Sequence, residues 1–179
     1  MSQDKPTPDA VDGSELRIAV VAAGYNGELV EAMLGRTLKA LRSGGVKEDS
    51  VRIVRVPGSG EIPYAAYMTA MTGDYDCVIA LGVVIAGDTP HFDVIAHSTA
   101  KALQDVALRA EVPVINGIIV ANDRSQAVAR CQGALDRGTE FAHAALTMAL
   151  HRIELGERLD QVEDEERRRR EGQDPFAQN

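Results

Sequence analysis

Four short segments rich in apolar residues divide the chain at regular intervals. They span residues 16–22, 51–56, 77–84 and 114–120. Such runs are typical of strands that are buried on both faces of a parallel sheet. Between them, apolar residues recur every three or four positions, as over 29–41 and 92–107, which predicts amphipathic helices. Strands that alternate with helices predict an α/β fold, a three-layer αβα sandwich with a four-stranded parallel sheet.

Turn and cap residues predict where the helices begin. Asn26 follows the first strand within the turn 24–26, and we expect it to be the N-cap of a helix. Thr89 is expected to cap a later helix that has Pro90 at its first position. The predicted helices cover about 26–44, 61–71, 90–109, 124–134, and 138 to 155 or beyond.

The two ends of the chain differ from its centre. Residues 1–15 are rich in Pro, Asp, Ser and Gly without an apolar period, and we expect a flexible N-terminal arm. Residues 16–156 are expected to form a single domain. Residues 157–179 mix acids with arginines and are expected to form a charged C-terminal extension, in part a solvated helix with i,i+4 ion pairs and in part disordered.

Composition narrows the function classes. The net charge of −8 argues against a nucleic-acid partner, and acidic neighbours offset the arginines at 167–170. There is no apolar run of transmembrane length and no signal-peptide pattern, so we expect a cytoplasmic protein without a membrane partner. Cys77 and Cys131 lack CxxC spacing and a histidine cluster, so buried or idle thiols are expected rather than a disulfide or a metal site.

Three turns are expected at the carboxyl edge of the sheet, where ligands of such sheets bind. The turn 85–89 leads from a strand into a helix, and its free N–H groups suit a phosphate or another small anion. His91 follows, with a residue type suited to proton transfer near neutral pH, although a lone histidine at a helix start can also be purely structural. The turns 24–26 and 58–61 add an aromatic ring and a carboxylate. No GxGxxG motif or Walker lysine is present, which argues against a dinucleotide enzyme.

Taken together, three segments resemble the lumazine synthase family: VPGSGEIPYAA at 56–66, ALGVVIAGDTPHFD at 80–93 and PVINGIIVANDRSQAVAR at 113–130. The likeness runs from about Leu16 to Leu155. It implies a flavodoxin-like fold and the condensation of 5-amino-6-(D-ribitylamino)uracil with 3,4-dihydroxy-2-butanone 4-phosphate, a transferase reaction that releases phosphate and water. It also implies no metal or organic cofactor, and a homo-oligomer built as a pentamer or multiples of one.

The resemblance assigns roles by position. His91 matches the acid–base histidine, and Tyr25 matches the aromatic that stacks on the pyrimidine. Asn116 and Arg130 match residues that reach the site from an adjacent subunit, Arg130 toward the phosphate. The implied substrate-binding residues are Tyr25, Ser59, Glu61, Ile62, Val84, Ile85, Gly87, Asp88, Thr89, Asn116 and Arg130.

Departures from the family pattern keep two alternatives open. Ala86 replaces a common arginine, Gly60 replaces a residue that is commonly large, and Val120-Ala121 replaces Thr-Thr. The loop before Gly138 is shorter than usual, and Arg137 stands in place of a lysine. A non-catalytic flavin- or lumazine-binding paralogue, or a shell-forming one, would also fit these changes.

Overall fold

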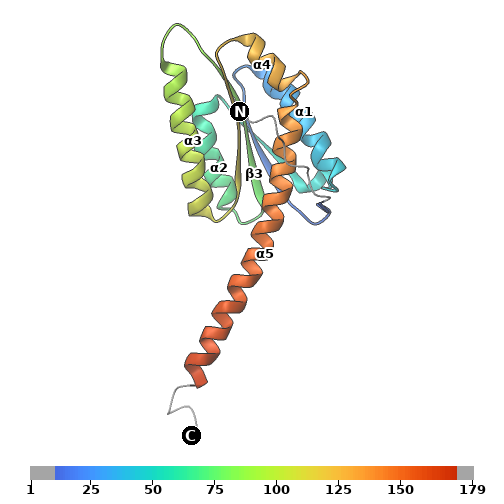
Figure 1. The fold of residues 1–179 in the computed structure, drawn as a ribbon, viewed down its shortest axis with the longest axis vertical. Coiled ribbons are helices and arrows are strands. Elements are labelled where there is room, and N and C mark those ends of the chain that lie inside the picture. Colours follow the sequence, from blue (N-terminus) through green and yellow to red (C-terminus); the bar gives the residue numbers. More distant parts are fainter. Residues whose placement is uncertain (1–10, 173–179) are drawn as a thin grey trace.

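The computed structural model describes residues 11–172 and shows helices on both sides of one sheet (Figure 1). Two short 3₁₀ helices, η1 (Glu48–Ser50) and η2 (Ser59–Glu61), precede β2 and α2. The strands and α-helices in chain order are β1 (Ile18–Ala23), α1 (Gly27–Ser43), β2 (Val51–Val56), α2 (Ile62–Ala70), β3 (Cys77–Ile85), α3 (His91–Ala110), β4 (Val114–Ala121), α4 (Arg124–Cys131) and α5 (Arg137–Gly172).

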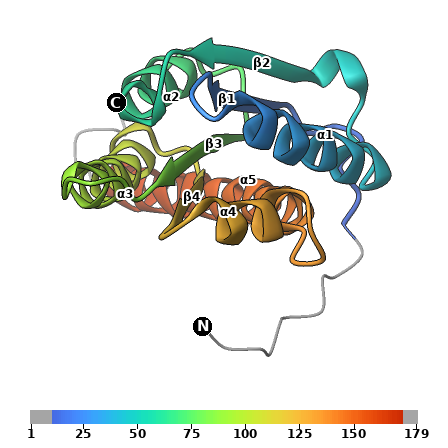
Figure 2. The same cartoon turned by 90° about the horizontal axis from the view of Figure 1, so that it is seen from above.

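The four strands form a parallel sheet in the order β2-β1-β3-β4, seen between the two helical layers in Figure 2. In its register, Val20 of β1 lies opposite Ile53 of β2 and Ile79 of β3. Helices α1, α4 and α5 cover one face, and α2 and α3 cover the other. The predicted three-layer αβα sandwich with a four-stranded parallel sheet is confirmed.

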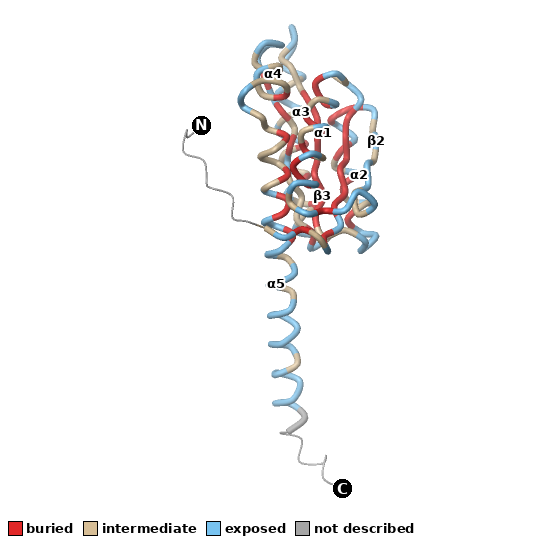
Figure 3. Tube along the Cα trace, turned by 90° about the vertical axis from the view of Figure 1, so that its right-hand side faces the viewer, coloured by how far each residue is buried: buried red, intermediate tan, exposed pale blue. Residues whose placement is uncertain are grey.

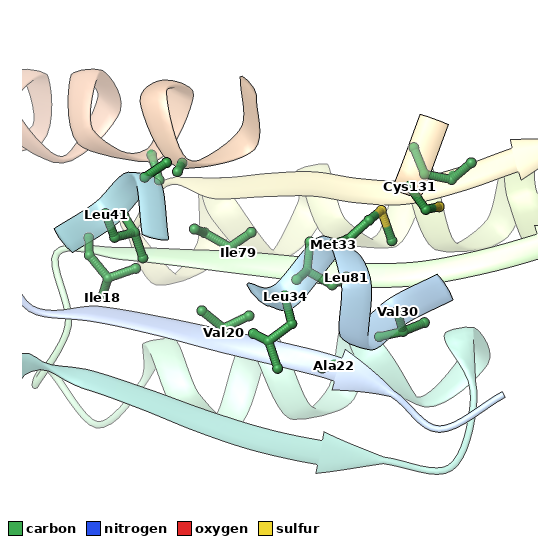
Figure 4. Close-up of a cluster of buried hydrophobic side chains, with 14 of the residues drawn as sticks. Ile18, Val20, Ala22, Val30, Met33, Leu34, Leu41, Ile79, Leu81 and Cys131 are labelled. Carbon is green, nitrogen blue, oxygen red and sulfur yellow. The ribbon is translucent and has the colours of Figure 1, made fainter. Parts of the chain in front are cut away.

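Alternate residues of the central strands supply two hydrophobic cores. Ile18, Val20 and Ala22 of β1 face α1, α4 and α5, whereas its other residues face α2 and α3. Figure 4 shows the first core, to which Met33 of α1 and Leu81 of β3 both belong. Because β1 is buried on both faces, its sequence is apolar throughout rather than alternating.

Helices α1 and α5 approach closely where α5 begins. A Cβ atom at Gly138 would lie 2.5 Å from the backbone oxygen of Met33, so only glycine fits there. The buried hydroxyl of Thr37 lies 2.9 Å from the Met33 oxygen and 3.1 Å from that of Gly138, within hydrogen-bond distance of both. This close packing places the start of α5 against the middle of α1.

The two ends of the described residues differ: residues 11–15 pack on the domain, whereas the last part of α5 extends away from it. Residues 1–10 of the expected arm lie outside the described residues, but residues 11–15 pack on the domain, where Gly13 N–H donates to Gly44 at 2.7 Å. Helix α5 continues to Gly172 and leaves the body as an exposed rod (Figure 3). Ion pairs along it join Arg169 to Glu165 and Arg170 to Glu166, as the i,i+4 pattern predicts. Residues 173–179, expected to be disordered, also lie outside the described residues.

Candidate active site

The carboxyl ends of β1 and β3 form the topological switch point of the sheet, because β2 and β4 flank them on opposite sides. The turn after β1 is bonded to the turn after β2. Gly24 N–H donates to the Val56 oxygen at 2.8 Å, and Tyr25 N–H donates to the Pro57 oxygen at 3.0 Å. Two of the three predicted turns therefore form one continuous surface.

Asn26 connects this surface to the third strand. It precedes α1 in the left-handed conformation, with φ of 54°, and its side chain does not cap the helix. Instead, its amide Nδ2 donates to the Val83 oxygen of β3 at 2.9 Å. Asn26 is the N-cap of α1, as predicted, but its amide binds across the switch point, and only its backbone carbonyl accepts hydrogen bonds from the first turn of α1.

The second turn supports the ring of Tyr25. A Cβ atom at Gly58 would lie 3.1 Å from that ring and 3.1 Å from the carboxylate of Glu61. Glu61 accepts a hydrogen bond from Gly58 N–H at 2.8 Å, which holds the turn closed. Tyr25 nevertheless remains 74% exposed, so this residue is available for stacking on a planar ligand.

Ser59 lies beneath this surface rather than on it. Its hydroxyl would be only 2.6 Å from a Cβ atom at Gly82, so the absence of a side chain on β3 makes room for it. Ile62 is fully buried in the α2 and α3 core, so its side chain packs there and does not face solvent. Gly82 was not among the predicted residues; an isolated glycine inside an apolar strand is the signal that could have found it.

The third turn presents open backbone groups. Val84, Ile85 and Ala86 are half-buried at the end of β3, and residues 87–90 are exposed. Within residues 11–172, the N–H groups of Gly87, Asp88 and Thr89 have no hydrogen-bond partner. Three adjacent free donors beside a helix start are suited to an anion.

Helix α3 begins one residue later than predicted. His91 is its first residue, and Pro90 occupies the N-cap position without a side-chain hydrogen bond. The expectation that Thr89 caps this helix is therefore wrong, because Pro90 provides the first acceptor, its oxygen taking the N–H of Asp93 at 3.1 Å. The His91 side chain is exposed at the same end of the sheet as Tyr25.

Two predicted residues lie away from this surface. Asn116 is exposed on the edge strand β4, opposite Ala80, about 16 Å along the strand from its end at Ala121. Its Oδ1 accepts the Ile118 N–H at 3.1 Å. Arg130 lies in the last turn of α4, on the other face of the sheet from α3, and donates to the Gln126 oxygen at 2.9 Å. One chain therefore does not bring Asn116 and Arg130 to His91.

Asp123 orients the helix that carries Arg130. Its carboxylate is the N-cap of α4 and accepts the Gln126 N–H at 2.8 Å. The hydrogen bond from the Ser125 hydroxyl, together with that from Gln126, holds the pKa of the Asp123 carboxyl below its usual value. This capping role had not been predicted, although Asp before a helix is a recognised start signal.

The positions that depart from the family pattern leave open space or find other partners. The nearest atom to a Cβ atom at Gly60 would be Ile95 Cδ1 at 3.9 Å, so this position is roomy. Val120 is exposed on β4, whereas Ala121 is buried. Arg137 pairs with Glu140 inside the first turn of α5. None of these contacts closes the site over Tyr25.

Two hollows among the described residues lie elsewhere. One, of about 230 Å³, lies between α1 and β2 and is lined by Leu38, Val51 and Ile53 among others. The other lies among side chains of the α5 rod. Residues 11–172 hold no group of three His, Cys, Asp or Glu side chains that could bind a metal ion. None of the helices in this range is long and apolar enough to cross a membrane.

Comparisons with known proteins agree on one family. The sequence model of 6,7-dimethyl-8-ribityllumazine synthase matches residues 15–152. The protein of that name from Salinibacter ruber is 44% identical over 140 residues, which cover 78% of this chain and 88% of the relative. The one from Thermococcus gammatolerans is 43% identical over 137 residues, covering 76% and 88%. The one from Methylobacterium radiotolerans is 40% identical over 159 residues, covering 88% and 94%.

Proposed function

This chain belongs to the 6,7-dimethyl-8-ribityllumazine synthase family, and we propose that it performs the reaction of that family at the carboxyl edge of its sheet. It is a transferase of riboflavin biosynthesis. It condenses 5-amino-6-(D-ribitylamino)uracil with 3,4-dihydroxy-2-butanone 4-phosphate to form 6,7-dimethyl-8-ribityllumazine, releasing phosphate and water. The observation that carries the assignment of the site is that the exposed Tyr25 and the turn 85–89, with the free N–H groups of residues 87–89, lie at the same edge of the sheet.

In this proposal the pyrimidine lies on the ring of Tyr25. Ser59 and Glu61, with the backbone of Ile62, hold the pyrimidine and its ribityl chain, and the backbone of Val84 and Ile85 bonds the pyrimidine edge. The exposed Tyr25 ring and its support by Gly58 favour such a stacking role. Because Ser59 and Ile62 are buried, their contribution is to shape the floor of the site.

The phosphorylated substrate binds at the next turn. The free N–H groups of Gly87, Asp88 and Thr89 offer donors to its phosphate, and the start of α3 adds a positive helix dipole. The amine of the pyrimidine attacks the ketone to give an imine with loss of a first water, phosphate leaves by elimination, and ring closure with loss of a second water completes the product. His91, exposed beside the phosphate turn, transfers protons in these steps.

The site is shared between copies of the chain. Tyr25 and Glu61 belong to the β1 and β2 side of the sheet, whereas Asn116 lies on the opposite edge at β4. A head-to-tail contact between copies would bring the β4 edge of one copy to the β1 and β2 side of the next. Repeating this contact would close a ring. Asn116 and Arg130 then complete the neighbour's site. The exposed apolar residues Tyr64 and Met68 of α2, together with Met71 directly after it, offer apolar surface for a contact between copies to bury.

We take this ring to be a pentamer or a multiple of one, and its location to be the cytoplasm. Two free cysteines, Cys77 and Cys131, fit a reducing compartment. Light scattering of the purified chain tests the assembly. A monomer at micromolar concentration would contradict the shared site, and a mass of five or more chains would support it.

One assay tests the function itself. The purified chain is mixed with both substrates, and the lumazine is followed by its absorbance and fluorescence against the spontaneous reaction. Formation of lumazine well above that background supports a working synthase. No product above background, together with tight binding of riboflavin, would instead favour a flavin- or lumazine-binding paralogue, although every relative named above is a synthase.

A further inference from the structure

The short connection between α4 and α5, residues 132–136, is held by a side chain from a third helix. Arg36 of α1 donates from Nη1 to the Gly133 oxygen at 2.8 Å and from Nη2 to the Gln132 oxygen. The same Nη1 lies 3.4 Å from Oδ1 of Asp136. One guanidinium therefore contacts both the end of α4 and the residue before α5.

These contacts suit an arginine in particular. The guanidinium is planar, permanently charged and carries five N–H donors, so it can serve two carbonyls and a carboxylate together. Only 30% of the Arg36 side chain is exposed, so solvent replaces these bonds poorly. The negative end of the α4 dipole adds to the attraction, because the two acceptor carbonyls follow directly on its last residue, Cys131.

The backbone of the connection 132–136 is tightly constrained. A Cβ atom at Gly133 would lie 2.6 Å from the Ala129 oxygen, so its backbone is pressed onto α4. Asp136 has φ of 34° and caps α5, accepting the Thr139 N–H at 3.2 Å and the Thr139 hydroxyl at 2.9 Å. A shift of Asp136 would therefore move the start of α5 and the end of α4 together.

Arg130 lies two residues before the first carbonyl that Arg36 binds, in the last turn of α4. We propose that Arg36 is a positioning residue for Arg130, setting the place from which Arg130 reaches the phosphate of the substrate in an adjacent copy. This inference rests on the proposed function, in which Arg130 contacts that phosphate. Arg36 touches no substrate, and its effect passes through the backbone of α4.

The experiment compares the wild type with Arg36→Ala, Arg36→Lys and the control Arg55→Ala. Arg55 also binds a residue of α1, Glu31, but does so from β2 and far along the chain from α4. For each protein we would measure kcat, KM for each substrate, Kd for inorganic phosphate by calorimetry, and the melting temperature.

Arg36→Ala is expected to raise KM for the phosphorylated substrate and Kd for phosphate about tenfold, with KM for the pyrimidine unchanged. Arg36→Lys keeps the charge but cannot serve both carbonyls, so its values should lie between those of the wild type and Arg36→Ala. Arg55→Ala should leave all four kinetic and binding values unchanged.

Two results would overturn the proposal. One is a lower melting temperature for Arg36→Ala with both KM values unchanged. The other is an equal rise in the KM values for both substrates. Either result would indicate a purely structural role for Arg36. A wild type that forms no lumazine would contradict the proposed function instead. In that case the phosphate titration still decides about Arg36, because equal Kd values, or no phosphate binding at all, would exclude the positioning role.

Discussion

The side-chain amide of Asn26 donates a 2.9 Å hydrogen bond to the backbone oxygen of Val83, joining the turn after β1 to β3 across the switch point of the sheet. Tyr25 precedes this asparagine, and Val84 follows the acceptor. The bond therefore sets the spacing between the aromatic ring and the strand end that form the proposed pyrimidine site.

Two substitutions of Asn26 separate the contribution of its side-chain hydrogen bond from that of its left-handed backbone. Asn26→Gly keeps the left-handed backbone but removes the amide, and should lower the free energy of unfolding by about 1 kcal/mol. Asn26→Ala also removes the amide but keeps a Cβ atom at φ of 54°, where alanine is less favoured than glycine, so it should be about 1 kcal/mol less stable than Asn26→Gly. Urea unfolding checks both values. Equal stabilities of the two variants would show that the backbone conformation is unimportant here.

His91→Ala should slow turnover by about 10²-fold or less with both KM values largely unchanged, because proton transfer is one contribution among several. Steady-state kinetics at neutral pH measure this change. His97→Ala is the matched control on the same helix. The His97 ring lies exposed and only bonds the Asp93 oxygen at 2.8 Å, so its loss should leave turnover intact. If His97→Ala slowed the reaction as much as His91→Ala, the assignment of His91 would be wrong.

Arg130→Ala should weaken binding of the phosphorylated substrate by about 2 to 4 kcal/mol if its bond to the phosphate is charge-assisted and desolvated. The pyrimidine should bind as before. Arg124→Ala is the control within α4, since Arg124 pairs with the exposed Glu28 at 2.9 Å. An unchanged KM for the phosphorylated substrate in Arg130→Ala would refute the phosphate role.

Both thiols should be unreactive in the folded chain. Burial raises the pKa of Cys77 to about 12 and that of Cys131 to about 11, from an ordinary 9.0. At pH 8 the thiolate fractions are then about 10⁻⁴ and 10⁻³, so a disulfide reagent should label neither until urea unfolds the chain. Rapid labelling of the native protein would mean that the surrounding core opens readily.

The raised pKa values of the two thiols also determine how the stability of the fold changes with pH. The folded chain keeps two thiol protons that the unfolded chain releases once the pH exceeds 9.0. Stability should therefore be unaffected by these thiols below pH 9 and should fall as the pH rises from about 9 toward 11 and 12. Urea midpoints measured across this range test the sign.

The fold was predictable from the sequence because local pattern and burial agree in it. The strands lie within two residues of their predicted positions, since the apolar runs at 16–22 and 77–84 mark the two central strands. Helix ends were less predictable. Thr89 was expected to cap α3, but the adjacent Pro90 takes the N-cap position. Asn26 does precede α1, but its amide binds Val83 of a strand that comes much later in the sequence, which a local motif cannot indicate.

The candidate site was predictable only in part, for a geometric reason. Tyr25, Glu61 and the turn 86–89 come together because they follow neighbouring parallel strands. Asn116 and Arg130 were assigned by resemblance alone, and the single chain leaves them on β4 and α4. The contacts of Arg36 were not predicted because its partners, at 132–136, are about a hundred residues away in sequence.

The placement of Tyr25 and Asn116 on opposite sides of the sheet has a genetic consequence. In the proposed ring, a defect in His91 and a defect in Arg130 damage different halves of each site. Subunits carrying one defect and subunits carrying the other, produced in the same cell, would form mixed rings in which some sites combine an intact histidine with an intact arginine. Two alleles that each impair the enzyme alone would then complement one another, whereas two alleles altered at His91 would not.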